Sequence, residues 1–443
     1  MARQRIACGM VLLSAIVGCR PEATSDRHYG TVSRHGRPLT TIVVNNFDEP
    51  EYLDSTLASD QVSSILISDL FEGLVVKHPR TLEPVQGVAE RYDKSEDDRL
   101  FRFFLRKEAR WSDGRPVVAS DFVYAWRRVL TPATGSRSAT LLHVVKNGRL
   151  FNQNKLMRLR EASSLYESAK GKIVQKLAAG TAWQILSRKG DWAEVVEHRD
   201  LPYFGKPPPK PLAKPARGFV RAAVLVANPD VIGVRATSSH VLEVQLEDPT
   251  PYFLELCSYV VSYPVRQDLI EHFAAKGQED RWARAENIIT NGPYTVDDWR
   301  FRYRIVFKRN PHHYEHDQLK IHRIVWLEVP NINATLNLYK TGELDYVGAA
   351  MSLPPAHMGR LSAFEDFSRS MYLSTYWYVF NVTKKPVDDP RVRLALNLAV
   401  DKRQLVDKVT RGGQTPALHY VPDATGSGYS EMAAENRRKG TDP

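Results

Sequence analysis

The sequence has little cysteine: its three thiols, Cys8, Cys19 and Cys257, are spread over 443 residues. A disulfide framework or a four-thiolate zinc site needs more cysteines at closer spacing, so the sequence excludes both. After its first 20 residues, the chain also lacks an apolar run near the roughly 18 residues that cross a bilayer. A polytopic membrane protein is therefore excluded, and hydrophobic packing in two or three domains must supply the stability.

The sequence also lacks the common catalytic and cofactor motifs. It contains no glycine-rich phosphate loop, no helix with paired zinc-binding histidines and no serine elbow between glycines. The nearest metal-like group is the run of histidines at His312, His313 and His316, with His322 beyond it. This run follows the turn signal Asn310-Pro311, which favours an exposed turn over a metal site. We predict no catalytic residue, no cofactor and no metal site.

The net charge of +10 is concentrated in one segment. Between Lys146 and Arg221 there are 16 Lys and Arg against 6 Asp and Glu, while the rest of the chain has 45 of each sign. Prolines are mixed with these basic residues, and no aromatic-stacking motif of the kind that binds bases accompanies them. We predict a solvated basic surface and no nucleic-acid partner, with anionic polymers or lipid headgroups as the alternative partners.

The N-terminus has the pattern of a secretory signal. Arg3 and Arg5 precede an apolar stretch over 10–17, which ends in Ile16-Val17-Gly18-Cys19. The small residues before the cysteine resemble the lipobox of bacterial lipoproteins, in which the Cys19 thiol is acylated. A plain signal peptide with an incidental cysteine is the alternative. We predict a lipoprotein signal peptide over 1–19, lipidation of Cys19 and a flexible tether over 20–40.

Hydrophobic periodicity predicts that strands alternate with helices along the chain. The expected strands lie at 41–45, 100–105, 241–246, 305–308 and 324–329. The expected helices lie at 61–74, after a cap at Ser120, at 333–339 and at 389–409. This alternation predicts an α/β fold.

The stretch from Leu150 to Phe219 differs in composition from the rest. We expect a charged helical piece as far as Lys170, then three short strands and a proline-rich return. The spacing of Gly180-Thr181 and Gly190-Asp191-Trp192 resembles bacterial Src-homology-3-like domains, and a plain β-hairpin excursion is the alternative. The sequence therefore predicts a small, basic, β-rich insertion over 150–219.

Eight segments in chain order resemble the extracytoplasmic oligopeptide-binding proteins of ABC importers, family 5 of the bacterial extracellular solute-binding proteins. They are DLFEGL at 69–74, GVAE at 87–90, LR with WSDG within 105–114, DFVYAW at 121–126, PTPYF at 249–253, NIITNGPY at 287–294, GELD at 342–345, and DPRVR with AVDK within 389–402. Apart from the signal and the insertion, the resemblance covers nearly the whole chain. It implies a two-lobed periplasmic-binding-protein-like clamshell that closes on an extended peptide.

The resemblance also implies how the chain divides. The first lobe would comprise 41–149 and 220–265, and 266–443 would form the second lobe. The family continues beyond the point where this sequence ends, and the carboxylate that pairs with the peptide's α-amino group lies in that later part, so it is assigned to no residue here. An incomplete second lobe is expected to expose a sheet edge and apolar surface.

By alignment with the family, a strand-pairing segment of the first lobe falls at Ser59, Asp60 and Gln61. A peptide of variable sequence is held by pairing with its repeating N–H and C=O groups, while its side chains lie in roomy pockets. An ordinary turn ahead of the helix at 61–74 is the alternative for these residues.

The resemblance places a tyrosine-rich cleft wall at Tyr376, Trp377 and Tyr378. Aromatic side chains give a tolerant cleft a large contact area at little entropic cost, and strand core is their alternative. Asn291 and Tyr294 lie near the expected lobe crossing and are further ligand candidates, although a turn role in Asn-Gly-Pro explains them equally.

These observations predict a substrate-binding lipoprotein of an ABC importer that binds oligopeptides and is not an enzyme. It would act as a monomer at the periplasmic or cell-surface side, lipid-anchored to the membrane, and would partner an ABC permease in transmembrane transport. Two alternatives stay open: a binder of nickel or another non-peptide cargo within the same superfamily, and a wall-associated interaction protein that acts through its basic insertion.

Overall fold

The structure is a computed structural model that describes the chain in five stretches, 27–31, 34–206, 214–348, 353–369 and 374–417. The predicted signal peptide, including Cys19, lies outside the described residues. Among the helices of the described stretches, none is both long enough and apolar enough to span a membrane.

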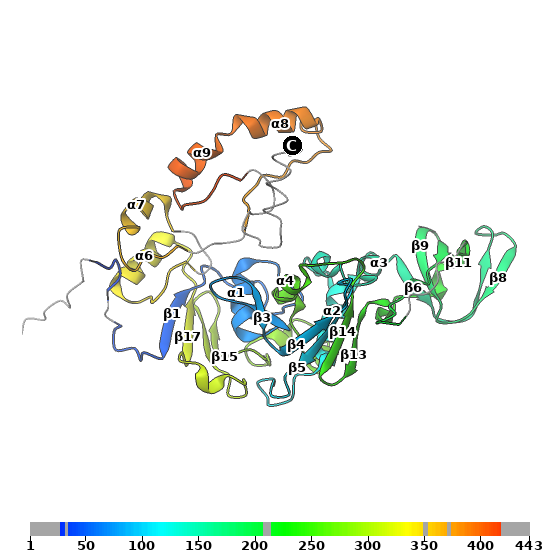
Figure 1. The fold of residues 1–443 in the computed structure, drawn as a ribbon, viewed down its shortest axis with the longest axis horizontal. Helices are drawn as coiled ribbons and strands as arrows, with labels where there is room; N and C mark the ends of the chain where they lie inside the picture. Colours follow the sequence, from blue (N-terminus) through cyan, green and yellow to red (C-terminus); the bar gives the residue numbers. More distant parts are fainter. Residues whose placement is uncertain (1–26, 32–33, 207–213, 349–352, 370–373, 418–443) are drawn as a thin grey trace, which may run out of the picture.

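One four-stranded sheet joins segments from distant parts of the chain (Figure 1). In spatial order its strands are β1 (Thr41–Asn45), β17 (Arg323–Leu327), β16 (Arg304–Arg309) and β15 (Tyr294–Arg300). β1 runs parallel to β17, and the other pairs are antiparallel. The strands predicted from periodicity at these places are therefore confirmed, with small shifts at their ends.

This sheet crosses the lobe boundary predicted after residue 265. The prediction places β1 in the first lobe and β15, β16 and β17 in the second, yet β1 pairs with β17 along its whole length. Because backbone hydrogen bonds make the four strands one layer, residues 294–327 belong with β1, and the boundary after residue 265 is wrong for this sheet. The other domain boundaries stay predictions.

A second four-stranded sheet is antiparallel throughout. In spatial order its strands are β13 (Val234–Ser238), β14 (Val241–Gln245), β5 (Leu100–Leu105) and β4 (Ala89–Lys94). The helix α2 (Ala119–Leu130) packs on β13 and β14. Phe122, Trp126 and Val129 recur at helical spacing and are fully buried, so one face of α2 lies in the core.

The start of α2 differs from the prediction. Its capping residue is Val118, and Ser120 lies inside the helix. The Asp121 carboxylate accepts hydrogen bonds from the Val118 N–H and from the Trp111 indole N–H, both at 3.0 Å. A carboxylate at the third helical position can reach back to the capping residue's N–H, so Asp121 stabilises the start of α2 and the cap predicted at Ser120 is wrong.

The remaining helices and a small hairpin surround these two sheets. They are α1 (Gln61–Leu70), α3 (Gly148–Asn152), α4 (Phe253–Cys257), α5 (Gln267–Ala274), α6 (Ile332–Thr341), α7 (Met358–Leu361), β2 (Val75–Lys77) and β3 (Pro84–Gln86). Buried side chains from both sheets, α1 and α2 form one continuous hydrophobic core. Cys257 is buried in this core, as predicted, and burial raises its pKa well above the ordinary value.

The insertion is a separate seven-stranded sheet at one end of the molecule (Figure 1). In spatial order its strands are β12 (Leu225–Val226), β6 (Leu156–Leu159), β9 (Ala182–Lys189), β10 (Trp192–Glu197), β11 (Arg217–Arg221), β7 (Ser163–Tyr166) and β8 (Ile173–Leu177). Trp183, Val195 and Val220 belong to a second hydrophobic core that is distinct from the first. The insertion is therefore β-rich, as predicted, and its core is its own.

One expectation within the insertion is wrong. The charged helical piece predicted as far as Lys170 is absent from the described residues, because α3 ends at Asn152 and the strands β6 and β7 follow it. The three later strands and the turn at Gly190 occur where the alternation predicts them. The likeness to Src-homology-3-like domains stays a prediction.

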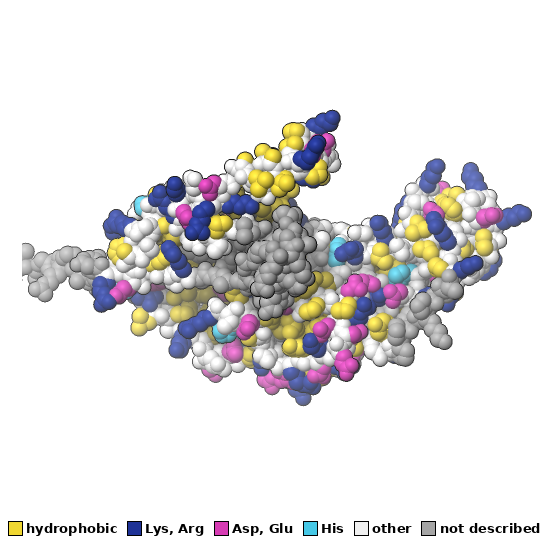
Figure 2. All heavy atoms as spheres, turned by 45° about the horizontal axis from the view of Figure 1, so that its top comes forward, with side chains coloured by type: hydrophobic (Ala, Val, Ile, Leu, Met, Phe, Trp, Pro, Cys, Tyr) yellow, Lys and Arg dark blue, Asp and Glu magenta, His cyan; other side chains and the backbone are white. Residues whose placement is uncertain are grey.

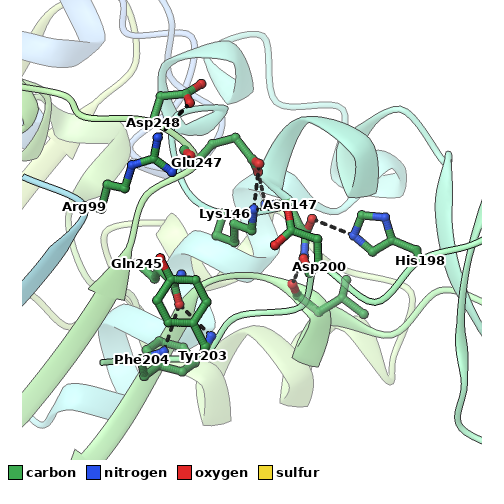
Figure 3. Close-up of polar contacts among 11 residues, drawn as sticks. Arg99, Lys146, Asn147, His198, Asp200, Tyr203, Phe204, Gln245, Glu247 and Asp248 are labelled. Atoms are coloured by element: carbon green, nitrogen blue, oxygen red, sulfur yellow. Dashed lines mark hydrogen bonds and ion pairs between the residues drawn. The ribbon is translucent and has the colours of Figure 1, made fainter. Parts of the chain in front are cut away.

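A buried lysine joins the insertion to the body (Figure 3). Lys146 is 5% exposed, and its ammonium group lies 2.5 Å from the Asp200 carboxylate and 2.8 Å from that of Glu247. Asp200 lies on the connection between β10 and β11 of the insertion, and Glu247 lies just beyond β14. The ion pairs therefore bind this connection to the second sheet.

Amide side chains complete this junction (Figure 3). The Gln245 side-chain oxygen accepts hydrogen bonds from the backbone N–H groups of Tyr203 and Phe204 at 2.7 and 2.9 Å. The Asn147 amide donates to the Asp200 carbonyl at 3.1 Å, and its oxygen lies 3.1 Å from Nε2 of His198. These contacts satisfy buried polar groups on both sides, so the insertion is held in one orientation.

The C-terminal described stretch is helical in pieces. It contains α8 (Pro390–Ala399), α9 (Lys402–Gln404) and a π-helical turn over Leu405–Thr410. Val400 and Asp401 interrupt the single helix predicted over 389–409, because Val400 has extended backbone angles and those of Asp401 are also not helical.

We predict that Lys146→Ala lowers the free energy of unfolding by about 1–3 kcal/mol, since two carboxylates lose a charged hydrogen-bond donor. Asp200 and Glu247 are 59% and 42% exposed, so water solvates them and the loss falls below the cost for a fully buried pair. Urea denaturation at neutral pH measures the change. Lys172→Ala, which removes an exposed lysine of the insertion, is the control. Equal losses of unfolding free energy in the two variants would contradict the stabilising role of Lys146 at the junction.

Candidate functional site

The loop between β1 and α1 is held by one buried carboxylate. Asp54 accepts hydrogen bonds from the Thr56 N–H at 2.9 Å and from the Thr56 hydroxyl at 2.6 Å, and it pairs with the Arg128 guanidinium of α2 at 2.8 Å. The Asp54 carbonyl accepts from the N–H groups of Leu57 and Ala58. The turn that leads to residue 59 is therefore fixed to α2.

Ser59, Asp60 and Gln61, the predicted strand-pairing residues, follow this turn. Ser59 and Gln61 are exposed, whereas the Asp60 carboxylate caps α1 by accepting from the Ser63 N–H at 2.7 Å. Within the described part of the chain, the Ser59 N–H and C=O and the Gln61 N–H make no hydrogen bond. The segment thus presents unpaired backbone groups on a backbone that is fixed at both ends.

Three carboxylates gather near the end of the first sheet. Glu49 accepts from the Trp299 indole N–H and from the Arg302 N–H, both at 2.7 Å. Burial, followed by the negative charges of Glu49 and Asp48, raises the pKa of Glu328 to about 8. This grouping was invisible in the sequence, because Glu328 follows β17 and Glu49 follows β1, and only the parallel pairing of these strands brings them together.

Asn291 has a structural position. It is buried, its amide donates to the Glu72 carbonyl at 2.9 Å, and its oxygen accepts from the Glu72 N–H at 3.2 Å. The Glu72 carboxylate in turn accepts from the Tyr314 hydroxyl at 2.6 Å and lies 3.3 Å from Nε2 of His313. A Cβ at Gly292 would lie 2.7 Å from the Leu70 backbone, so the chain passes too closely for a side chain there. Asn291 therefore joins the end of α1 to the first sheet.

Tyr294 is also buried at the start of β15. Its hydroxyl donates to the Ile321 carbonyl at 3.1 Å, and burial together with the nearby charge of Asp69 raises its pKa to about 12. The structure therefore places Asn291 and Tyr294 in the packing between elements, and it does not bring them to the exposed surface of Ser59 and Gln61.

The predicted aromatic wall is exposed. Tyr376 and Tyr378 are 84% and 81% exposed, Trp377 is 50% exposed, and the two tyrosine rings meet edge to face at 5.8 Å. No helix or strand includes these residues, so the alternative that they form strand core is wrong. Figure 2 shows apolar side chains along α8 as well, where Leu394 and Leu398 are exposed.

The predicted ligand residues line neither of two depressions found on the surface. One, of about 490 Å³, lies on the insertion, and the other, of about 600 Å³, lies beside α2 near Tyr124 and Arg127. The histidine run makes internal contacts, because His316 Nδ1 lies 2.8 Å from the Asn310 carbonyl. The described residues contain no group of three or more His, Cys, Asp or Glu side chains that could hold a metal ion.

The sequence and the structure are similar to those of known binding proteins. Residues 83–440 match the family model of bacterial extracellular solute-binding proteins, family 5 Middle. The chain is 32% identical over 385 residues to the periplasmic oligopeptide-binding protein OppA of Escherichia coli K12, and 29% identical over 382 residues to the periplasmic murein peptide-binding protein MppA of the same strain. These alignments cover 87% and 85% of this chain but only 57% and 56% of the relatives' lengths.

A solved structure supports the same relationship. The crystal structure of Haemophilus influenzae OppA in complex with the peptide RPPGFSPFR has a TM-score of 0.65 and 26% identity to this chain. The likeness covers 87% of this chain and 60% of that one. The predicted fold class, a two-lobed periplasmic-binding-protein-like α/β fold, is confirmed.

We predict that Asn291→Ala lowers the free energy of unfolding by about 2–4 kcal/mol, because it leaves both the N–H and the C=O of Glu72 buried without their partner. Urea denaturation measures the loss. Asn287→Ala is the matched control, because its amide donates to the Arg281 carbonyl at an exposed position. If Asn291→Ala loses no more unfolding free energy than Asn287→Ala, Asn291 does not have the structural role assigned to it between α1 and the first sheet.

We predict that Glu328→Gln raises the melting temperature at pH 9 relative to the unsubstituted protein. A carboxyl group whose folded-state pKa is about 8, above the ordinary 4.5, stabilises the fold at low pH and loses that contribution as pH rises between the two values. The difference in melting temperature between Glu328→Gln and the unsubstituted protein should therefore vanish near pH 4.5. Glu279→Gln, at an exposed carboxylate without an ion pair in the described residues, is the control. A pH-independent difference would contradict the assignment.

Proposed function

This chain belongs to family 5 of the bacterial extracellular solute-binding proteins, and from that premise we propose that it captures oligopeptides for an ABC importer. The observation that carries the proposal is that the Ser59 N–H and C=O and the Gln61 N–H, at exposed positions, make no hydrogen bond within the described residues. Water solvates such exposed groups in the absence of a guest, and an extended peptide could replace it with complementary groups at every residue.

Strand pairing explains why two residues of the segment would contact the guest and the third would not. In an extended segment, alternate residues direct their backbone groups to the same side, so Ser59 and Gln61 face one partner. Asp60 between them has extended backbone angles, and its side chain is engaged at the α1 cap. Recognition would rest on the main chain, and the peptide's side chains would contribute little selectivity.

The exposed aromatic residues Tyr376, Trp377 and Tyr378 would form a second wall against the guest. Their rings offer a large contact area and lose few rotatable bonds on binding, which suits guests of varied sequence. Closure of the lobes would bring this wall toward the strand-pairing segment and exclude water from the backbone hydrogen bonds.

The remaining features of the proposal follow from the family and the N-terminal sequence. The chain would be tethered by a lipid on Cys19, on the periplasmic side or at the cell surface, and would act as a monomer that passes peptides to a membrane permease. It would carry out no catalysis. The relatives named above are binding proteins, which supports this part of the proposal.

We predict that Gln61→Pro weakens peptide binding at least tenfold, whereas Gln61→Ala changes it less than twofold. Gln61 is the first residue of α1, where proline is tolerated because that N–H has no partner within the helix. The extended angles of Asp60 also suit the residue before a proline. The substitution therefore removes the N–H that a peptide would use and leaves the helix intact.

Isothermal titration with RPPGFSPFR and with a pool of tripeptides to pentapeptides measures the binding. Circular dichroism and the melting temperature establish that both variants fold. Equal affinities in the proline and alanine variants would overturn backbone pairing at this segment. A complete absence of binding by the unsubstituted chain to peptides, together with binding to a nickel chelate or another non-peptide solute, would favour the alternative cargo.

A further inference from the structure

We propose that the insertion carries a binding site of its own, for a small organic anion with an aliphatic body. The site is the depression between the turn at 153–155 and the outer half of β9. It lies apart from the strand-pairing segment, because neither Ser59 nor Gln61 lines it. The inference therefore goes beyond the proposed capture of peptides and does not depend on it.

The depression has the size of a small-molecule site. Its volume is about 490 Å³, within the roughly 300–1,000 Å³ typical of ligand pockets. The lining side chains are of three kinds, amide, apolar and basic, and they are Gln153, Asn154, Lys155, Met157, Ile185, Leu186 and Arg188. No carboxylate is among them.

The depression arises because β9 is longer than its neighbour. β6 pairs with β9 only from Arg158 to Leu156, and the Ile185 N–H then donates to the Lys155 carbonyl at 2.8 Å. Beyond that point the outer residues of β9, as far as Lys189, pair with β10 alone. One side of β9 is therefore left open at its outer end.

The floor of the depression is apolar. Met157 and Ile185 are largely buried against the core of the insertion, and Leu186 is exposed beside them. The unbranched, polarizable side chain of methionine adapts its shape to different neighbours. Such a floor can pack against an aliphatic chain of a few carbons. It has no polar group that could pair with a second charged group on the ligand.

The rim of the depression is positively charged. Lys155 and Arg188 are exposed, and neither forms an ion pair within the described residues. The Arg188 guanidinium reaches across the floor, where its Nη2 lies 3.1 Å from the Met157 sulfur. A planar guanidinium in this position can bind a carboxylate through two parallel N–H groups.

The nearby acidic residues do not neutralise this rim. Glu194 on β10 is paired with Arg217 at 2.6 Å, and Glu197 is paired with Arg199 at 2.5 Å. Two unpaired cations over an apolar floor thus select a ligand with one anionic end and one aliphatic end. Figure 2 shows other basic side chains projecting from the insertion, and an extended polyanion would contact those instead.

The chemistry of an aliphatic carboxylate occurs both in a short fatty acid and at the C-terminal residue of a peptide. Titration of the full chain, followed by ligand-observed NMR, separates these sources with hexanoate and N-acetyl-leucine as probes. Hexanol and N-acetyl-leucinamide are the matching neutral probes. The acetyl group blocks the α-amino group, so the second probe reports a carboxylate end alone.

The double variant Lys155→Ala with Arg188→Ala should weaken binding of the charged probes at least tenfold. The matched control, Lys170→Ala with Lys172→Ala, removes the same charge from exposed positions beside β8 and should leave binding within twofold. Leu186→Asp, at an exposed position, should abolish binding without unfolding the insertion. Melting temperatures check the folding of each variant.

Saturable binding of hexanoate but not of N-acetyl-leucine would assign the site to free acyl anions, and the reverse would assign it to peptide C-termini. Equal binding of charged and neutral probes would overturn the proposal. So would equal weakening by the two double variants, or no saturable binding of either charged probe. If Gln61→Pro loses peptide binding but binds the charged probes at the insertion as tightly as the unsubstituted chain, the two proposed sites are independent of each other.

Discussion

The arrangement of the exposed backbone at the start of α1 depends on the buried ion pair between Asp54 and Arg128. Asp54 follows β1 in the first sheet, and Arg128 lies on α2, which packs on the second sheet. Removing one partner of such a pair leaves a buried charge, at a cost of about 3–5 kcal/mol, so the turn and α2 stay together. The N–H groups of Ser59 and Gln61 are consequently held in place without a guest, and the proposed binding of a peptide there would cost little conformational entropy.

The sequence predicts the regular elements well and the polar contacts poorly. Apolar patterning is a local signal, and it identifies β1 from a short apolar run and β5 from alternation, each within five or six residues. The start predicted for α2 at Ser120 is wrong, because the helix begins earlier, at Ala119, and the Asp121 carboxylate binds the Val118 N–H and the Trp111 indole. The contact with Trp111 depends on the tertiary structure, so local sequence does not reveal it. The unpaired N–H of Ser59 cannot be predicted, since a missing hydrogen bond is a property of all its surroundings.

The insertion shows a second limit of sequence interpretation. The sequence predicts a charged helical piece as far as Lys170, and within that piece Leu156, Met157 and Leu159 do not alternate with polar residues as a half-exposed strand requires. In the structure all three side chains are buried or nearly so, because β6 lies where the insertion meets the body. A strand covered on both faces loses its alternation, and a short apolar run is then compatible with a helix or a strand.

The two proposed sites would use opposite principles of recognition, and the junction at Lys146 allows both in one chain. In the proposed pairing, the backbone groups at Ser59 and Gln61 would bind every extended peptide alike, so that segment would tolerate varied guests. Lys155 and Arg188 distinguish an anion from a neutral molecule, and they distinguish little else. Because Lys146 and Gln245 hold the insertion in one orientation, its basic rim keeps a constant position relative to the body.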